Sequence, residues 1–203
     1  VYNASHLMGF FSTFNSDVLR DVALYKGPIP AQYGERLSAI LDVQQRNGDM
    51  QKYGVSGGIG LISSKVNVEG PIQKGKSSFL LGARRTYADA IARLSGVEDA
   101  QNAYLYFYDL NMKLYFALSD KDQLSVSGYL GRDKMVLKDI ADMGWGNMFL
   151  NAKWTRTISP KWLSTTSLHH NRYPYGLEVD MVMEDQVYGK IKDDGFQFEI
   201  QLK

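Results

Sequence analysis

The segment Tyr104–Leu118, with the sequence YLYFYDLNMKLYFAL, alternates strictly between two kinds of side chain. Its even positions are all apolar or aromatic, whereas its odd positions include Asp109, Asn111 and Lys113. Successive side chains of a strand point to opposite faces, so one face of this strand is apolar and the other carries charge. Strands in soluble domains usually have about 5–6 residues, and a tilted strand that crosses a bilayer needs about 9–11. The segment is long enough to cross a bilayer.

Similar alternation continues along most of the chain and predicts up to eight strands. They are expected near 53–60 and 62–70 (a tight hairpin or one longer strand), 76–88, 104–118, 123–135, 146–158, 162–174 and 194–203. The only helix candidate is Tyr87–Leu94. Short polar turns are predicted at Gly70–Ser77, Ser119–Gln123 and Ser159–Lys161, and long links at Ala88–Ala103, Asp133–Gly146 and Tyr175–Asp194. Short turns on one side and long loops on the other are typical of outer-membrane barrels.

Composition removes several classes of function. The net charge of +1 provides no basis for nucleic-acid binding, and the absence of Cys excludes disulfides, thiolate metal sites and cysteine nucleophiles. No apolar run approaches the roughly 18 residues of a transmembrane helix. The alternation therefore favours a transmembrane β-barrel. The alternative is a soluble β-sandwich or adhesin-like binding module of the cell envelope, in which the apolar face of the sheet packs on a second sheet.

The stretch before the predicted strands carries a more specific pattern. It consists of a strand at Val22–Tyr25, the turn Lys26-Gly27-Pro28, the pair Tyr33-Gly34 and an apolar strand at Ala39–Val43. This order resembles the end of the plug domain of TonB-dependent outer-membrane receptors. The sequence NVEGPI (Asn67–Ile72) is similar to the first periplasmic turn of these barrels. The longer stretch GGIGLISSKVNVEGPI, together with ARRTYAD, resembles the branch of that family that carries a carboxypeptidase-regulatory-like N-terminal domain. Where many members have a Gly-Gly pair before the final plug strand, this chain has Leu37-Ser38.

The resemblance implies an all-β fold in which the end of a plug domain is followed by about eight antiparallel strands of a large transmembrane β-barrel. Residues 1–51 are expected to be the C-terminal part of the plug and residues 52–203 the N-terminal strands of the barrel. A closed barrel of eight strands has an interior just wide enough for its own side chains, and only far larger barrels have a plugged lumen. The chain, which starts at Val1 without an initiator Met, is therefore expected to be an internal fragment of a longer polypeptide.

The function that the resemblance implies is import. A transporter of this family binds a scarce ligand outside a Gram-negative bacterium and passes it through the outer membrane to the periplasm with energy relayed by TonB. The expected partners are TonB, through a segment absent from this chain, the outer-membrane lipid, the remainder of the same polypeptide, and an unknown small ligand, glycan or peptide. Neither catalysis nor a cofactor is expected.

Three groups of site residues follow from the resemblance and from the parity of each strand. The plug motif is Lys26, Gly27, Pro28, Tyr33, Gly34 and Arg36; the lumen-facing candidates are Arg84, Asp109, Lys113 and Lys153; and the aromatic girdle is Tyr104, Tyr106, Tyr108, Trp154 and Trp162. Arg36, next to Glu35, has two open interpretations, which are a surface position and a role in holding the plug against barrel carboxylates.

Metal and phosphate sites are not expected. His169 and His170 are adjacent, so on a strand they point to opposite faces and cannot share a metal in regular geometry. The acidic residues of the last long link, which are Asp180, Glu184, Asp185, Asp193 and Asp194, match no calcium-loop spacing. Gly57, Gly58 and Gly60 are not a phosphate-binding loop, because no helix follows them.

Overall fold

The computed structural model describes residues 5–9, 11–27, 39–87, 103–138, 140–179 and 190–202, and in β12 (Lys190–Leu202) it describes the backbone alone. These residues form an all-β structure, as predicted, with only two short 3₁₀ helices, η1 (Leu7–Gly9) and η2 (Ser16–Val18). No helix among the described residues is long and apolar enough to span a membrane. The helix candidate at Tyr87–Leu94 lies almost wholly outside the described residues.

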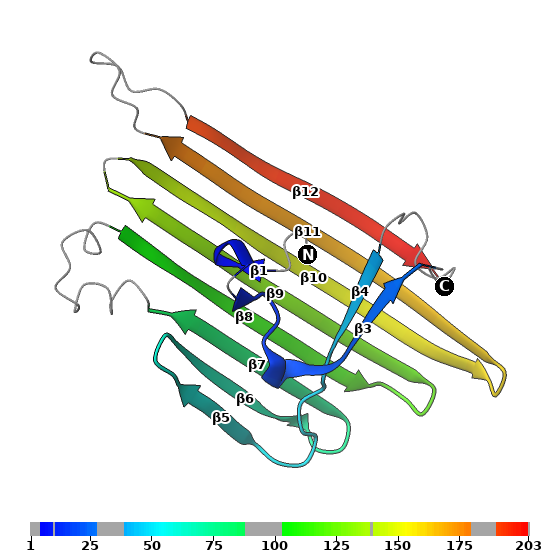
Figure 1. Cartoon of the computed structure of the whole chain (residues 1–203). Helices are drawn as coiled ribbons and strands as arrows, with labels where there is room; N and C mark the ends of the chain where they lie inside the picture. Colours follow the sequence, from blue (N-terminus) through cyan, green and yellow to red (C-terminus); the bar gives the residue numbers. More distant parts are fainter. Residues whose placement is uncertain are drawn as a thin grey trace.

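An antiparallel sheet of eight strands makes up most of the structure (Figure 1). Each strand pairs with the next along the chain, so β5 and β12 form the two edges of the described sheet. The strands are β5 (Gly54–Ile59), β6 (Ser63–Gln73), β7 (Ser77–Thr86), β8 (Ala103–Ala117), β9 (Asp122–Leu137), β10 (Ala141–Ser159), β11 (Trp162–Val179) and β12. The region 53–70, which the sequence left open between a hairpin and one strand, is a hairpin.

Two strand boundaries correct the sequence prediction. The long link predicted at Asp133–Gly146 is wrong, because β9 continues to Leu137 and β10 begins at Ala141. The charged residues of this stretch are typical of a loop, but in the structure Lys134 of β9 and Asp142 of β10 form an ion pair across the two strands. The link predicted at Tyr175–Asp194 is shorter than expected, since β11 runs to Val179 and β12 begins at Lys190.

Pro174 lies inside β11 and explains why the sequence suggested an earlier end. Proline has no N–H to donate to a ladder. The pairing of β11 with β10 accordingly skips from Arg172 to Tyr175, whereas the pairing with β12 continues through Pro174. Because one ladder is maintained, the strand does not stop at the proline.

The link between β9 and β10 is short, because β9 ends at Leu137 and β10 begins at Ala141. The predicted strict alternation of short and long links fails at this connection.

The two faces of the sheet differ in chemistry and in exposure. We call the face of Asp109, Asn111 and Lys113 the polar face and the face of Leu110 and Met112 the apolar face. Asp109 is 2% exposed and Asn111 is 5% exposed, whereas Leu110 is 44% exposed. The structure thus covers the polar face and leaves the apolar face open. The alternation predicted for Tyr104–Leu118 is confirmed.

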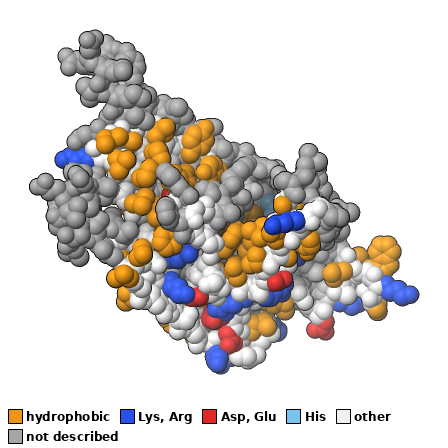
Figure 2. Space-filling model, in the orientation of Figure 1, with side chains coloured by type: hydrophobic (Ala, Val, Ile, Leu, Met, Phe, Trp, Pro, Cys, Tyr) orange, Lys and Arg blue, Asp and Glu red, His pale blue; other side chains and the backbone are white. Residues whose placement is uncertain are grey.

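The cover on the polar face is the N-terminal segment, by which we mean the described residues between 5 and 51. It contains the small sheet of β1 (Ser5–His6) and β2 (Phe11–Ser12), the two 3₁₀ helices, and a hairpin of β3 (Leu19–Lys26) and β4 (Ala39–Gln45). Figure 1 shows this segment in front of the sheet. In the same view Figure 2 shows positive and negative side chains interspersed in the lower half, where β5–β7 lie.

The buried apolar side chains lie between the segment and the sheet. Leu7 and Val18 of the segment are buried, as are Leu80 and Phe107 on the polar face. Gly82 permits the close approach of the two layers, because a Cβ there would lie 2.6 Å from Cγ1 of Val18 and 2.7 Å from Oδ1 of Asn67. The core is small, so polar contacts hold much of this interface.

We expect Gly82→Val to loosen the N-terminal segment. The added atoms collide with Val18, which is fully buried, and overpacking of this kind typically costs about 1–3 kcal/mol. Trypsin should then cleave at Arg20 faster than in the unsubstituted protein. Gly58→Ala is the matched control, since its Cβ meets only the Lys65 side chain at 3.9 Å. Equal cleavage rates in all three proteins would contradict the packing described here.

Candidate functional site

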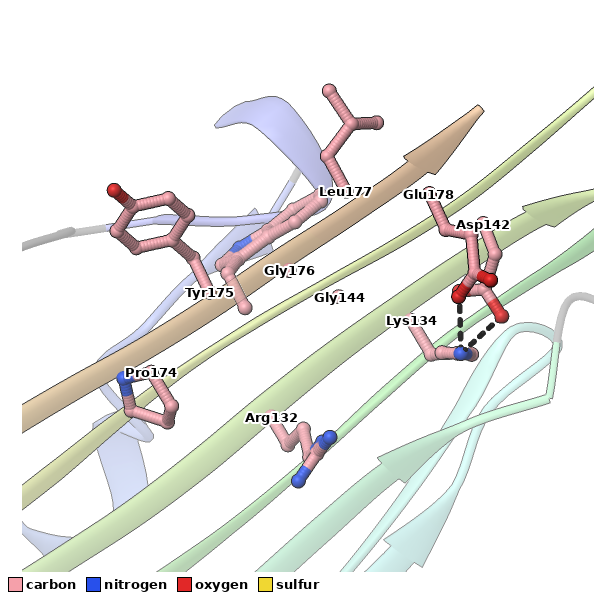
Figure 3. A pocket seen from close by; sticks show the side chains of 10 residues that line it. Arg132, Lys134, Asp142, Gly144, Pro174, Tyr175, Gly176, Leu177 and Glu178 are labelled. Atoms are coloured by element: carbon pink, nitrogen blue, oxygen red, sulfur yellow. Dashed lines mark hydrogen bonds and ion pairs between the residues drawn. The ribbon is translucent and has the colours of Figure 1, made fainter. Parts of the chain in front are cut away.

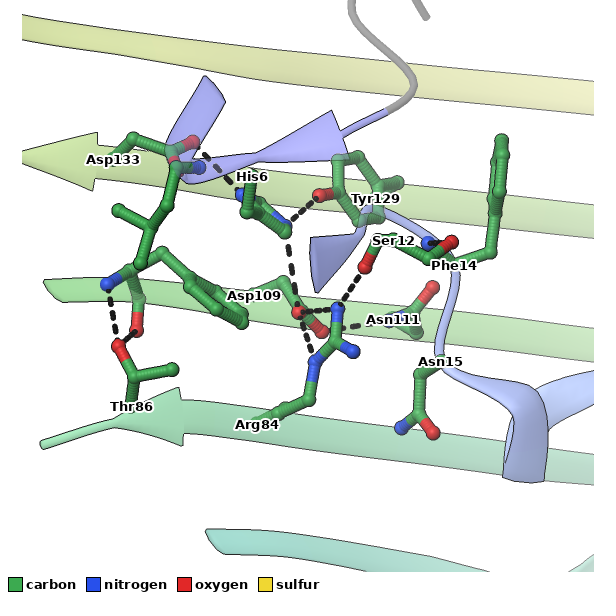
Figure 4. A network of polar contacts seen from close by, with 12 residues as sticks. His6, Ser12, Phe14, Asn15, Arg84, Thr86, Asp109, Asn111, Tyr129 and Asp133 are labelled. Carbon is green, nitrogen blue, oxygen red and sulfur yellow. Dashed lines mark hydrogen bonds and ion pairs between the residues drawn. The ribbon is translucent and has the colours of Figure 1, made fainter. Parts of the chain in front are cut away.

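A buried ion pair joins β7 and β8 beneath the N-terminal segment. Arg84 and Asp109 are directly opposite in register, and Nε of Arg84 donates to Oδ2 of Asp109 over 2.7 Å. A second guanidinium nitrogen donates to the backbone oxygen of Ser12 over 2.7 Å. The guanidinium also lies 5.0 Å from the ring centroid of Phe107. Arg84 therefore connects the sheet to the N-terminal segment (Figure 4). Arg84 and Asp109, two of the four lumen-facing candidates, both lie on the polar face.

His6 brings a second carboxylate into the same network. Its Nδ1 lies 2.8 Å from Oδ2 of Asp133, and its Nε2 lies 3.6 Å from Oδ2 of Asp109 and 3.0 Å from the hydroxyl of Tyr129. The ring stacks on Phe107 with a centroid distance of 4.1 Å. The backbone N–H of Leu7 donates to the other oxygen of Asp133 over 2.8 Å. Figure 4 shows His6 between Asp133, Tyr129 and Asp109.

The environment of His6 favours its protonated form. Burial alone would lower its pKa, but the hydrogen bonds and charges of Asp109 and Asp133 outweigh burial and raise the pKa above its ordinary value. The site then holds two carboxylates, one guanidinium and one imidazolium, so its charges cancel. Burial of charges is tolerated only with such pairing.

A second group of polar contacts ties the segment to β6. Asp17 of η2 pairs with Lys65 at 2.8 Å and accepts a hydrogen bond from Asn67 over 3.1 Å. The Lys65 hydrogen bond is the largest cause of a lowered pKa for Asp17. Arg46 pairs with Glu69 at 2.5 Å, and its Nε donates to the backbone oxygen of Asp17. These pairs are partly exposed and individually weaker than the buried network.

A large cavity lies between the β3–β4 hairpin and the polar face of β8–β11. Its volume is about 920 Å³. Lys113 and Lys153, the other two predicted lumen-facing residues, both line it. Much of the rest of the lining consists of hydroxyl and amide side chains with a few aromatic rings. All four lumen-facing candidates therefore share one face, in two groups: Arg84 and Asp109 under the segment, and the two lysines in the cavity.

The predicted aromatic girdle lies on the apolar face in two places. Tyr108 is 38% exposed, and it and its neighbours Tyr104 and Tyr106 lie at the end of β8 that pairs with Arg132–Val136. Trp154 and Trp162 lie toward the opposite end of the sheet, near the β10–β11 turn, and are 43% and 71% exposed. The indole N–H of Trp154 donates to Asp122 over 3.1 Å.

The plug motif is only partly within the described residues. Lys26 ends β3, and Gly27 has a φ of +97°, a backbone conformation that favours glycine. Pro28, Tyr33, Gly34, Glu35 and Arg36 lie outside the described residues, so both interpretations of Arg36 stay open. The strands expected at Val22–Tyr25 and Ala39–Val43 are present as β3 and β4, and they pair with each other.

The remaining candidates carry no assembled site among the described residues. His169 lines the cavity, and His170 is the next residue of β11, which places it on the opposite face. No group of three His, Cys, Asp or Glu side chains in the described part of the chain could hold a metal ion. Asp180, Glu184 and Asp185 lie outside the described residues. Asp193 and Asp194 lie in β12, of which the backbone alone is described.

A small hollow of about 190 Å³ is lined by residues of β9, β10 and β11, among them Lys134, Asp142 and Gly144 of the stretch 133–146 that the sequence predicts to be a loop (Figure 3). Gly144 and Gly176 pair across β10 and β11. Because glycine has no side chain, the pair leaves space on this part of the sheet. Arg132 and the Lys134–Asp142 ion pair border the hollow. It contains no assembly of groups comparable with the buried network.

Sequence reasoning missed His6, Asp133 and Tyr129. His6 lies 127 residues from Asp133, so no local spacing connects them. Asp133 and Tyr129 share the parity of Gln123, Ser125 and Ser127 within the predicted strand 123–135, so the alternation of that strand was a signal that they lie on the polar face with Asp109.

We expect protection of residues 5–18 from hydrogen exchange to fall as pH rises. The pKa of His6 in the assembled protein is above the value of about 6.5 in an unfolded chain. Its stabilisation is therefore complete below that value and is lost as the pH passes the raised pKa. The charged groups that face it are Asp133, Asp109 and, through Asp109, Arg84. Exchange between pH 5 and 9, corrected for intrinsic rates, measures the effect.

The control for this experiment is His6→Asn, which retains a hydrogen-bonding side chain but does not titrate. Its protection should be lower at pH 5 and nearly independent of pH. Protection that increases with pH in the unsubstituted protein, or the same profile in both proteins, would contradict the role of His6.

Comparison of the chain with protein-family models, with curated proteins and with solved structures gave no match.

Proposed function

We propose that this chain is part of a TonB-dependent outer-membrane transporter. In this proposal residues 1–51 are the end of the plug and residues 52–203 are the first strands of the barrel wall, and β5 and β12 pair with further strands of the same polypeptide. The transporter binds a scarce ligand outside the cell and delivers it to the periplasm with energy from TonB. The observation that carries the proposal is the inverted burial of the sheet, in which Asp109, Asn111 and Asp133 are buried while apolar side chains such as Leu110 and Leu130 are exposed.

The apolar face supports the proposal through its pattern along the strands. Ala83, Leu110, Leu130 and Met148 lie in one row across four neighbouring strands, and the row continues to Arg172 on β11. The row beyond it contains Arg85, Tyr108, Arg132 and Gly146. From Leu110 to Phe116 the apolar band extends about 20 Å along β8, at about 3.4 Å per residue. An outward-facing apolar band of about 25 Å with aromatic residues at its borders is typical of outer-membrane barrels.

The polar face supports the proposal in a different way. A plugged barrel needs a polar lumen that binds a segment of the same chain, and here His6, Arg46 and Asp17 of the N-terminal segment all form ion pairs with the sheet. A soluble β-sandwich would instead place Leu110 and its neighbours against a second sheet. In the described part of the chain no second sheet covers the apolar face.

A charge on the apolar face should destabilise the protein in a bilayer, whereas the same residue on the polar face should not. Met112→Arg is expected to cost about 2–4 kcal/mol if the site lies near the bilayer midplane. Lys113→Arg is the matched control, because it places arginine at the next residue without changing the charge. Denaturant unfolding of the full-length protein in lipid vesicles measures the difference. Equal effects of the two substitutions would contradict the assignment of the faces.

A nitroxide at position 112 separates the proposal from the soluble alternative. In a bilayer its collisions with dissolved oxygen should be frequent and those with an aqueous nickel chelate rare. A nitroxide at position 113 should show the weaker oxygen and stronger nickel response of a water-filled lumen. If the label at 112 is shielded from both reagents, a second protein layer covers it and the β-sandwich is favoured.

A further inference from the structure

The basic residues of the polar face fall into two groups that differ in their partners. Where the N-terminal segment contacts β6 and β7, each cation has a carboxylate: Lys65 has Asp17, Arg46 has Glu69, and Arg84 has Asp109. Where the face lines the cavity, the pattern changes. Among the described residues neither Lys113 nor Lys153 has a carboxylate partner. Lys113 donates to the hydroxyl of Ser127, over 2.9 Å.

A third cation reaches the cavity from the hairpin. Arg20 of β3 lines it and donates to the side-chain oxygen of Gln44. Arg20, Lys113 and Lys153 all line the same cavity, so their like charges repel one another. Asp42 is the only carboxylate residue lining the cavity in the described part of the chain, and it accepts a hydrogen bond from Gln44 over 3.0 Å. Among the described residues, the lining of the cavity therefore has an excess of positive charge.

The wall of the cavity supplies hydrogen-bonding groups around these cations. In register with Lys113 lie Ser127 and Asn151, and in register with Lys153 lie Ser125 and Ser167. Hydroxyl and amide groups beside ammonium groups are suited to the oxygens of a carboxylate, phosphate or sulfate. Lys113 is partly buried, whereas Lys153 and Arg20 are exposed, so the attraction between an anion and these cations is greatest beside Lys113, where water screens it least.

We propose that the cavity between the β3–β4 hairpin and the polar face of β8–β11 binds an anionic solute through Lys113, Lys153 and Arg20. The anion relieves the mutual repulsion of the three cations, and Ser127 and Ser167 lie where they can donate to its remaining oxygens. The inference rests on the proposed function only for the route by which the solute arrives. The positive potential of the cavity is measurable whether or not the protein transports anything.

The test uses a thiol placed in the cavity of the full-length protein. The chain has no Cys, so Ser125→Cys introduces the single thiol of this chain, at a residue opposite Lys153 in register. Its reaction rates with an anionic and with a cationic methanethiosulfonate reagent are compared after normalisation to a free thiol. The anionic reagent should be favoured about tenfold or more, as expected for a cleft that concentrates anions.

Two further variants assign the effect to the lysines. In Lys113→Gln/Lys153→Gln the preference should fall at least several-fold, whereas Lys161→Gln, in the exposed β10–β11 turn, should leave it unchanged. Millimolar inorganic pyrophosphate should slow the modification of the introduced thiol in the parent but not in the double variant. Circular dichroism and heat-modifiable electrophoresis check that each variant is folded.

The outcomes separate this inference from the proposed function. Equal normalised rates for the two reagents would overturn the positive cavity, and a preference without protection by pyrophosphate would overturn anion binding. Either result leaves the nitroxide test of membrane insertion unaffected. Conversely, a strong anionic preference in a protein whose position 112 is shielded from oxygen would retain the anion site and reject the barrel.

Discussion

The N-terminal segment can cover a polar sheet face because the charges between them are matched. Asp109 and Asp133 are almost completely buried, and an unpaired carboxylate in such a position would be very unfavourable. Arg84 and protonated His6 balance them, and the backbone N–H of Leu7 satisfies a further oxygen. Loss of one partner of a buried pair typically costs about 3–5 kcal/mol. With few buried apolar side chains in this interface, the network determines where the segment lies.

The same alternation that supplies this polar face creates the open apolar face. A strand with period two cannot place Asp109 and Asn111 toward the segment without placing Leu110 and Met112 on the other side. The two faces are therefore one constraint and not two independent features. A solvent that accepts an extended apolar surface, such as lipid, makes both faces favourable at once, and this physical argument underlies the proposed membrane location.

Much of the sheet could be predicted from sequence, because periodicity is local. The parity of Arg84, Asp109, Lys113 and Lys153 was sufficient to place all four on one face. The prediction failed where a local signal had two interpretations: Asp133, Lys134 and Asp142 are typical of a loop, but in the structure their partners lie on other strands or in the segment. The position of His6 follows from contacts between residues far apart in the chain, and no pattern in one sequence reveals them. The cavity depends likewise on how the hairpin lies over the sheet.

We propose that the apolar face contacts lipid while the polar face encloses the N-terminal segment. Photo-crosslinking in vesicles that contain a diazirine-labelled acyl chain tests it most directly, with the modified residues identified by mass spectrometry. We expect lipid adducts on Leu110, Met112, Leu114 and Phe116 and none on Asp109, Asn111 or Lys113. Adducts on the second set, or a β8 strand without adducts in protein that sediments with the vesicles, would contradict it.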